Sequence, residues 1–203
     1  MFESIRRNLK IIKLSMDLNW MFSHKLFKSY IVKAEISQEI TRKPNSPVTI
    51  YKSIQEITEA TSKLKWTEDP WSGKLDLIKH PTFMQESINS HPEYSGDCDD
   101  FAAYWCAALL KSNLSNEVYI GICFYNKGNE NSGHACCVYK YDNKWFWVSN
   151  WKKCEPIEIN TNKDFAKSMV EYSGLKNFLN AYLIKMNKIT STDTLIFGDT
   201  VLI

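Results

Sequence analysis

The chain has 203 residues, 44% of them hydrophobic, which is enough for one sizeable core and too few for two full domains. Its 25 basic and 23 acidic residues leave a net charge of +2, so we do not expect nucleic acid as the general partner. No apolar run is long enough for a membrane span, and no glycine-rich phosphate-binding loop occurs among the seven glycines.

The first predicted element is an amphipathic helix over residues 2 to about 30, with apolar residues spaced three and four apart. Residues 1–33 carry seven basic and two acidic side chains, a local charge of +5. We interpret this segment as a helical extension with a solvated basic face. Alternatives are binding to a protein partner, a membrane surface or nucleic acid, and an inhibitory role over a cleft.

A boundary is predicted near residue 45, because residues 41–48 combine two prolines with polar residues. This divides the chain into an N-terminal extension and linker, 1–45, and one domain, 46–203. After the boundary, Ser53 and Glu56 form a capping-box pattern that predicts a short helix. Its buried face is expected to comprise Ile54, Ile57, Thr61 and Leu64.

Residues 66–96 are predicted to form a long, irregular connection, in which Trp71 is a candidate for lining a cleft or a core. A helix capped by Asp97 follows, with an apolar stripe from Phe101 onwards. Three strands are expected at 118–125, 133–141 and 144–151, the last two joined by a tight turn at 142–143. We further predict a helix over 163–180 and apolar β-prone segments at 195–197 and 201–203, which need pairing or cover.

The six cysteines are expected to be reduced thiols in a cytoplasmic protein. No secretory signal is recognised before them, and the adjacent Cys136 and Cys137 would point to opposite faces of a strand. We expect no zinc site and no cofactor, because no Cys-x-x-Cys pair occurs and the four histidines are scattered. Five of the thiols are interpreted as packing residues, and the exception is Cys98.

Cys98 lies where the predicted helix begins, and a helix N-terminus favours a thiolate and offers backbone N–H groups to an oxyanion. Because three aspartates surround it, an imidazole partner is needed, and His134 on a predicted strand is the candidate. Across the turn, Asn150 could orient His134, although Ser149 competes for that role if the strand register slips by one residue.

The segment Gly96-Asp-Cys-Asp-Asp-Phe-Ala102 resembles the Gly-x-Cys-x-Asp-Phe/Tyr-Ala motif of transglutaminase-like cysteine proteins. His134-Ala135, Asp142-Asn-Lys-Trp145 and Val148-Ser-Asn150 also resemble that family's His-Ala strand, turn and terminal Val-Asp segment. An ungapped match aligns Ser149 with the family's usual aspartate.

The resemblance implies an α+β fold of the papain-like class, with the Cys98 helix packed on an antiparallel sheet that bears His134. It further implies an enzyme that acts on amide bonds of a protein or peptide substrate through a cysteine thioester, as a peptidase, amidase, deamidase or acyltransferase. Hydrolysis is the expected outcome. The alternative is a catalytically inactive relative that serves as a binding or scaffold protein.

Overall fold

The computed structural model describes residues 28–68, 78–90, 96–127, 130–150, 154–173 and 178–203, and its architecture is mixed helix and sheet. Six antiparallel strands form one sheet in the order β4-β3-β2-β1-β5-β6. The strands are β1 (Val118–Lys127), β2 (Glu130–Tyr141), β3 (Lys144–Val148), β4 (Ile157–Ile159), β5 (Phe178–Ile189) and β6 (Leu195–Leu202). The α+β class predicted from the sequence is therefore confirmed.

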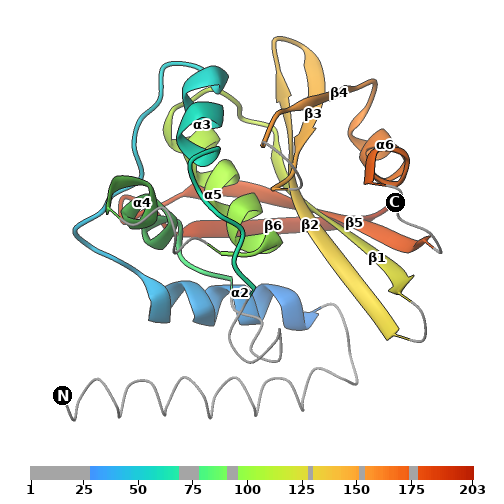
Figure 1. Ribbon diagram of the computed structural model, residues 1–203, viewed down its shortest axis with the longest axis horizontal. Helices are drawn as coiled ribbons and strands as arrows, with labels where there is room; N and C mark the ends of the chain where they lie inside the picture. The colour runs from blue at the N-terminus through green and yellow to red at the C-terminus, as the bar shows by residue number, and fades with distance from the viewer. Residues whose placement is uncertain (1–27, 69–77, 91–95, 128–129, 151–153, 174–177) are drawn as a thin grey trace.

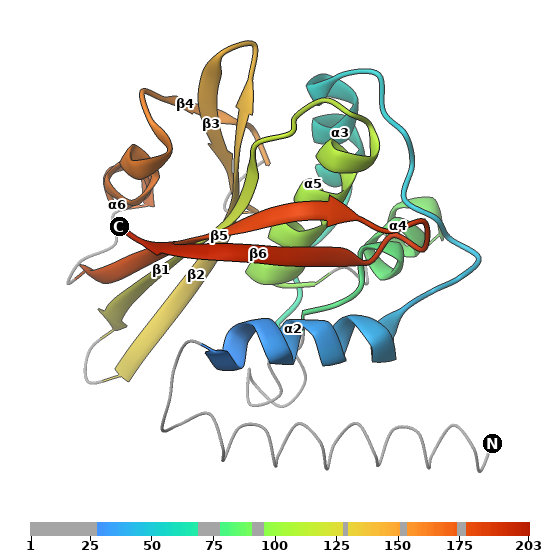
Figure 2. The ribbon, with the colours of Figure 1, turned by 180° about the vertical axis from the view of Figure 1, so that it is seen from behind.

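The helices are α2 (Lys28–Thr41), α3 (Ile54–Thr61), α4 (Pro81–Ser90), α5 (Cys98–Lys111) and α6 (Phe165–Ser173), the last preceded by a short 3₁₀ turn, η1 (Asn162–Asp164). Helices α3, α4 and α5 gather on one side of the sheet, whereas α6 lies on the other side, near β3 and β4 (Figures 1 and 2). Helix α5 packs directly on β2 and β1.

The strand alternation divides β2 between two apolar clusters. Ala135, Cys137 and Tyr139 face α5 and join the larger cluster, which also contains the buried side of that helix. Cys136 and Val138 face the other way and pack with Phe165 and other residues of α6. Since both faces of the central strands are covered, these strands are rich in apolar residues on each side.

The local signals around α3 and the β2–β3 hairpin are confirmed. Ser53 is the N-cap of α3, and its Oγ accepts from the backbone N–H of Glu56 at 3.2 Å. Asp142 and Asn143 form the hairpin turn with φ of 49° and 60°, values that asparagine and aspartate tolerate better than most residues. The turn fixes the register that pairs Cys137 with Val148.

The expectation of an irregular connection over 66–96 is wrong in part, because α4 occupies residues 81–90. Pro81 is the first residue of this helix, where a missing N–H costs nothing and the fixed φ favours helical geometry. His80, which precedes it, is fully buried, with Nδ1 2.8 Å from Thr82 Oγ1 and Nε2 3.1 Å from Thr194 Oγ1. Both ring nitrogens of His80 therefore have structural partners.

The helix predicted over 163–180 is also wrong at its C-terminal end, since α6 ends at Ser173 and β5 begins at Phe178. The C-terminal apolar segments belong to one strand, β6, which pairs with β5. The backbone N–H of Leu195 in β6 donates to Gln38 Oε1 of α2 at 3.0 Å. The expected pairing is thus present, while β6 is the edge strand of the sheet and Ile196, Val201 and Leu202 are exposed.

Most of the predicted N-terminal helix, and Trp71 with it, lies outside the described residues. Within the part of the chain that the structure describes, no helix combines the length and apolar character needed to cross a membrane.

Candidate active site

Cys98 is the first residue of α5, directly after the N-cap residue Asp97, as the sequence predicts. All six cysteines lie in the described parts of the chain; five are buried, and Cys98 alone is partly exposed. A nucleophile must be reachable by its substrate, and a helix N-terminus favours a developing thiolate. Cys98 is therefore the cysteine best placed to react.

The start of α5 is anchored by Asp100, whose side chain is completely buried. Its Oδ2 forms an ion pair with Lys79 Nζ at 2.5 Å and accepts from the backbone N–H of Asp97 at 3.2 Å. Its Oδ1 accepts from the backbone N–H of Lys79 at 2.5 Å. These bonds connect the segment before α4 to the first turn of α5, and so they fix the backbone that carries Cys98.

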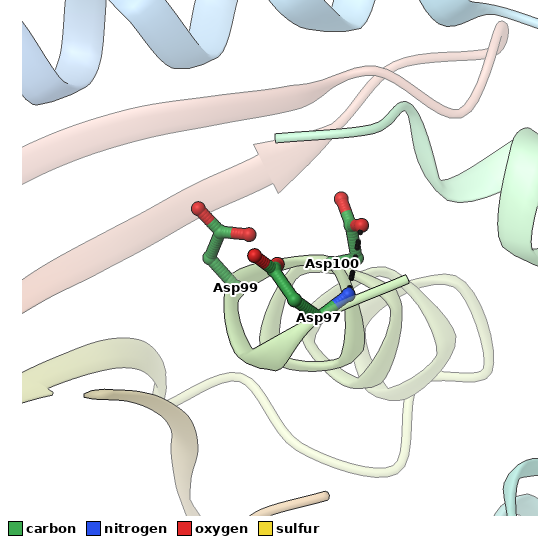
Figure 3. Close-up of side chains that lie close together, drawn as sticks. All are labelled: Asp97, Asp99 and Asp100. Carbon is green, nitrogen blue, oxygen red and sulfur yellow. Dashed lines mark hydrogen bonds between the residues drawn. The ribbon is translucent and has the colours of Figure 1, made fainter. Parts of the chain in front are cut away.

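Carboxylate oxygens of Asp97, Asp99 and Asp100 all lie within 4.8 Å of one another in the first turn of α5 (Figure 3). Oxygen donors of this kind suit hard cations such as Ca²⁺ or Mg²⁺. Asp100, however, is already engaged by Lys79 and by two backbone N–H groups. We therefore do not propose a metal centre here, and the expectation of no metal or cofactor stays a prediction.

His134 lies near the start of β2, buried at 7% exposure, and its Nε2 is 2.8 Å from Ser149 Oγ. The register explains this contact. Because Val148 pairs with Cys137, the next residue, Ser149, falls opposite Cys136, whose side chain shares a strand face with that of His134. The structure thus gives Ser149, and not Asn150, the direct contact with the imidazole.

Asn150 is connected to His134 through Ser149. The Ser149 hydroxyl donates to Asn150 Oδ1 at 3.4 Å, a long hydrogen bond. If the hydroxyl proton points to Asn150, Ser149 Oγ accepts from Nε2–H of the ring. We assign this tautomer from the hydrogen-bond network, and it makes Nδ1 the basic nitrogen of His134.

Burial lowers the pKa of His134 to about 4, and the negative charge of Asp97 opposes that shift. The imidazole is therefore neutral at pH 7 and able to accept a proton. The Asp97 carboxylate is close enough for its charge to act on the ring, so the N-terminal end of α5 lies near His134. An imidazolium formed at His134 would be stabilised by this carboxylate.

The remaining cysteines fill the interior, as predicted. Cys106 of α5 and Cys137 of β2 place their sulfur atoms 3.4 Å apart across the helix–sheet interface. Burial raises the pKa of Cys123 to about 12 and that of Cys154 to about 11. The pKa of Cys136 is raised by burial and also by nearby thiols, Cys98 among them. Thiols of this kind are poor nucleophiles, in contrast to the accessible Cys98.

Two residues of the site region were missed by sequence reasoning. Lys79 lies 21 positions before its partner Asp100, and nothing in the local sequence connects them. Trp66 forms an isolated parallel bridge with Gly96, and the N–H of Thr67 donates to the Gly96 carbonyl at 2.9 Å. Only the tertiary structure brings these residues to the start of α5.

A scan against models of known protein families and a search of curated proteins both gave no match.

Proposed function

We propose that this protein is a cysteine hydrolase of the transglutaminase-like type that acts on an amide bond of a protein or peptide substrate. The assignment rests on the sequence motifs around Cys98 and His134. The arrangement of a helix bearing the thiol, packed on an antiparallel sheet bearing the histidine, supports a papain-like core.

In the proposed reaction, Cys98 Sγ attacks the carbonyl carbon of the amide while His134 Nδ1 takes the thiol proton. The C–N bond then breaks, the same proton passes to the leaving amine, and a thioester remains on Cys98. Water, deprotonated by His134, attacks the thioester carbon; the C–S bond breaks, the acid is released and the thiol regains its proton. Backbone N–H groups at the start of α5 are the candidate donors to the oxyanion.

The observation that carries this proposal is the 2.8 Å contact of His134 Nε2 with Ser149 Oγ, beside the helix that starts with the one partly exposed cysteine. A ring held by Nε2 can present Nδ1 to a thiol, as a general base requires. Ser149 would serve as the orienting residue, the position at which the resembling family has aspartate. We propose Asn150 as an indirect contributor, through the Ser149 hydroxyl.

The proposal is tested by the rate at which iodoacetamide alkylates the native protein between pH 5 and 9, with the modified residue mapped by mass spectrometry. We expect selective labelling of Cys98 at a rate above that of free cysteine, and a fall of at least tenfold in a His134→Ala variant. Cys154→Ala is the matched control, since that thiol is buried and should not contribute.

Equal labelling of Cys98 in the wild type and in His134→Ala, at the rate of free cysteine, would contradict the catalytic proposal. It would favour a second candidate, a binding or scaffold protein that retains the fold without turnover. The low pKa of His134, caused by burial, and the neutral hydroxyl of Ser149 favour this second candidate, because both weaken proton transfer from a thiol.

A further inference from the structure

Trp66 is exposed to an extent that is unusual for tryptophan in this protein. Its exposed fraction is 55%, whereas Trp105 and Trp147 are each 1% exposed and Trp145 is half-buried. Of the tryptophans in the described residues, it is therefore the one that presents most of its surface to solvent. An indole ring is a large apolar group that contributes strongly to binding when a partner covers it.

The backbone that carries this indole is fixed close to the candidate nucleophile. Trp66 pairs with Gly96 in a parallel bridge, and Thr67 N–H donates to Gly96 O at 2.9 Å. Bridged strands lie about 5 Å apart, and two residues span at most about 7 Å, so the Cα atoms of Trp66 and Cys98 are at most about 12 Å apart. The indole of Trp66 and the side chain of a substrate bound at Cys98 are together long enough to span this distance.

The backbone bonds also reduce the entropy that the segment would lose on binding, because its position relative to Gly96 is already set. The neighbouring Lys65, Thr67 and Glu68 are exposed as well, so the indole belongs to an exposed stretch of the chain. Its chemistry selects an apolar or aromatic group, or the aliphatic stem of a longer side chain.

We propose that Trp66 is a specificity-determining residue that contacts an apolar or aromatic side chain of the peptide substrate, a few bonds from the amide attacked by Cys98. This inference rests on the proposed function for the role of Cys98, but the contact itself can be measured whether or not Cys98 turns over a substrate.

The test compares two alkylating reagents on the full-length protein: iodoacetamide and its aromatic relative N-benzyliodoacetamide. In both reactions the Cys98 sulfur forms a bond to carbon and iodide leaves. The readout is the rate of Cys98 alkylation by the benzyl reagent divided by the rate with iodoacetamide. This ratio is then divided by the same ratio for free N-acetylcysteine. We expect at least a fivefold preference for the benzyl reagent in the wild type.

A Trp66→Ala variant should lose this preference, and Trp66→Phe should keep most of it. Tyr172→Ala is the matched control, because Tyr172 is an aromatic residue of similar exposure, 45%, on α6 at the other side of the sheet. It should retain the wild-type ratio. A preference that survives in Trp66→Ala, or its absence from the wild type, would overturn the inference.

If the proposed function is wrong and His134 does not activate Cys98, the result is different. In that case iodoacetamide would label Cys98 at the rate of free cysteine irrespective of His134, while the benzyl preference and its dependence on Trp66 would still be present.

Discussion

Gly96 and Asp100 are in such close contact at the start of α5 that a Cβ atom at position 96 would overlap the Asp100 carboxylate. The same carboxylate accepts from the backbone of Asp97 and pairs with Lys79. The glycine and the third aspartate of the Gly-Asp-Cys-Asp-Asp segment, Gly96 and Asp100, thus have a structural role that does not depend on catalysis. They hold the helix end on which Cys98 is presented.

Gly96→Ala should therefore destabilise the protein by about 1–3 kcal/mol, the usual cost of overpacking a well-filled site. Urea unfolding monitored by circular dichroism would measure it. Gly133→Ala is the matched control, because a Cβ there meets nothing closer than 3.5 Å, an ordinary contact. If the two variants were equally stable, the close contact of Gly96 with Asp100 would have no energetic consequence.

The Lys79–Asp100 ion pair should be strongly coupled, since Asp100 is fully buried and the Lys79 side chain is only 16% exposed. Removing one partner leaves the other charge uncompensated, which costs about 3–5 kcal/mol for a buried pair. A double-mutant cycle with Lys79→Met and Asp100→Asn, read by urea unfolding, should give a coupling energy above about 1 kcal/mol.

The exposed pair Lys144–Glu158, at 3.1 Å, provides the comparison. Its coupling energy should be below about 0.5 kcal/mol, because solvent screens exposed pairs. A cycle at Lys79 and Asp100 with no more coupling than this would show that Asp100 is held by its backbone donors alone.

Stability should fall as the pH decreases from 6.5 towards 4, because burial lowers the pKa of both His80 and His134 to about 4. Unfolded histidine has a pKa near 6.5, so the unfolded state binds more protons throughout this window. Stability is therefore complete above about pH 6.5 and is lost below it, by about 2 kcal/mol per histidine between pH 7 and pH 5.

Urea unfolding at pH 7 and pH 5 measures this loss, and His134→Gln provides the internal test. Whatever the stability of the variant at pH 7, its free energy of unfolding should differ between pH 7 and pH 5 by about 2 kcal/mol less than that of the wild type. The other half of the histidine-dependent difference should be retained, because His80 still titrates. An unchanged difference between the two pH values would show that His134 is not held neutral by burial.

The elements with local signals could be predicted from the sequence, whereas those defined by tertiary contacts could not. The Ser53 cap and the turn at 142–143 depend on neighbouring residues, and both were found. Strand β5 was missed because it lies between β1 and β6 and is apolar on both faces, with Leu183 in one cluster and Ile184 in the other. A run of this kind lacks the alternation of apolar and polar residues that distinguishes a half-buried strand from a helix.

The same division holds for the site. Cys98 and His134 stand in short motifs, so the sequence alone could nominate them. The partner of the His134 ring depends on the strand register. Ser149 and Asn150 follow β3 directly and point to opposite faces, so a shift of one residue would exchange which of them lies on the face of His134. The backbone pairing of Cys137 with Val148 decides between them. It follows from the turn at 142–143 only when the residues are counted outwards from the turn without a shift, and the ladder in the structure shows that no shift occurs.

This register leads to a prediction that separates Ser149 from Asn150. Ser149→Ala removes the oxygen that contacts His134 Nε2, a hydrogen bond worth about 1 kcal/mol, and should slow Cys98 alkylation about fivefold at pH 7. Asn150→Ala removes only the acceptor of the Ser149 hydroxyl at 3.4 Å, and should slow it less than twofold. Stopped-flow alkylation of both variants would measure the difference. The reverse order of effects would mean that Asn150 contacts the ring when Cys98 reacts, and that the 2.8 Å bond to Ser149 describes only the resting protein.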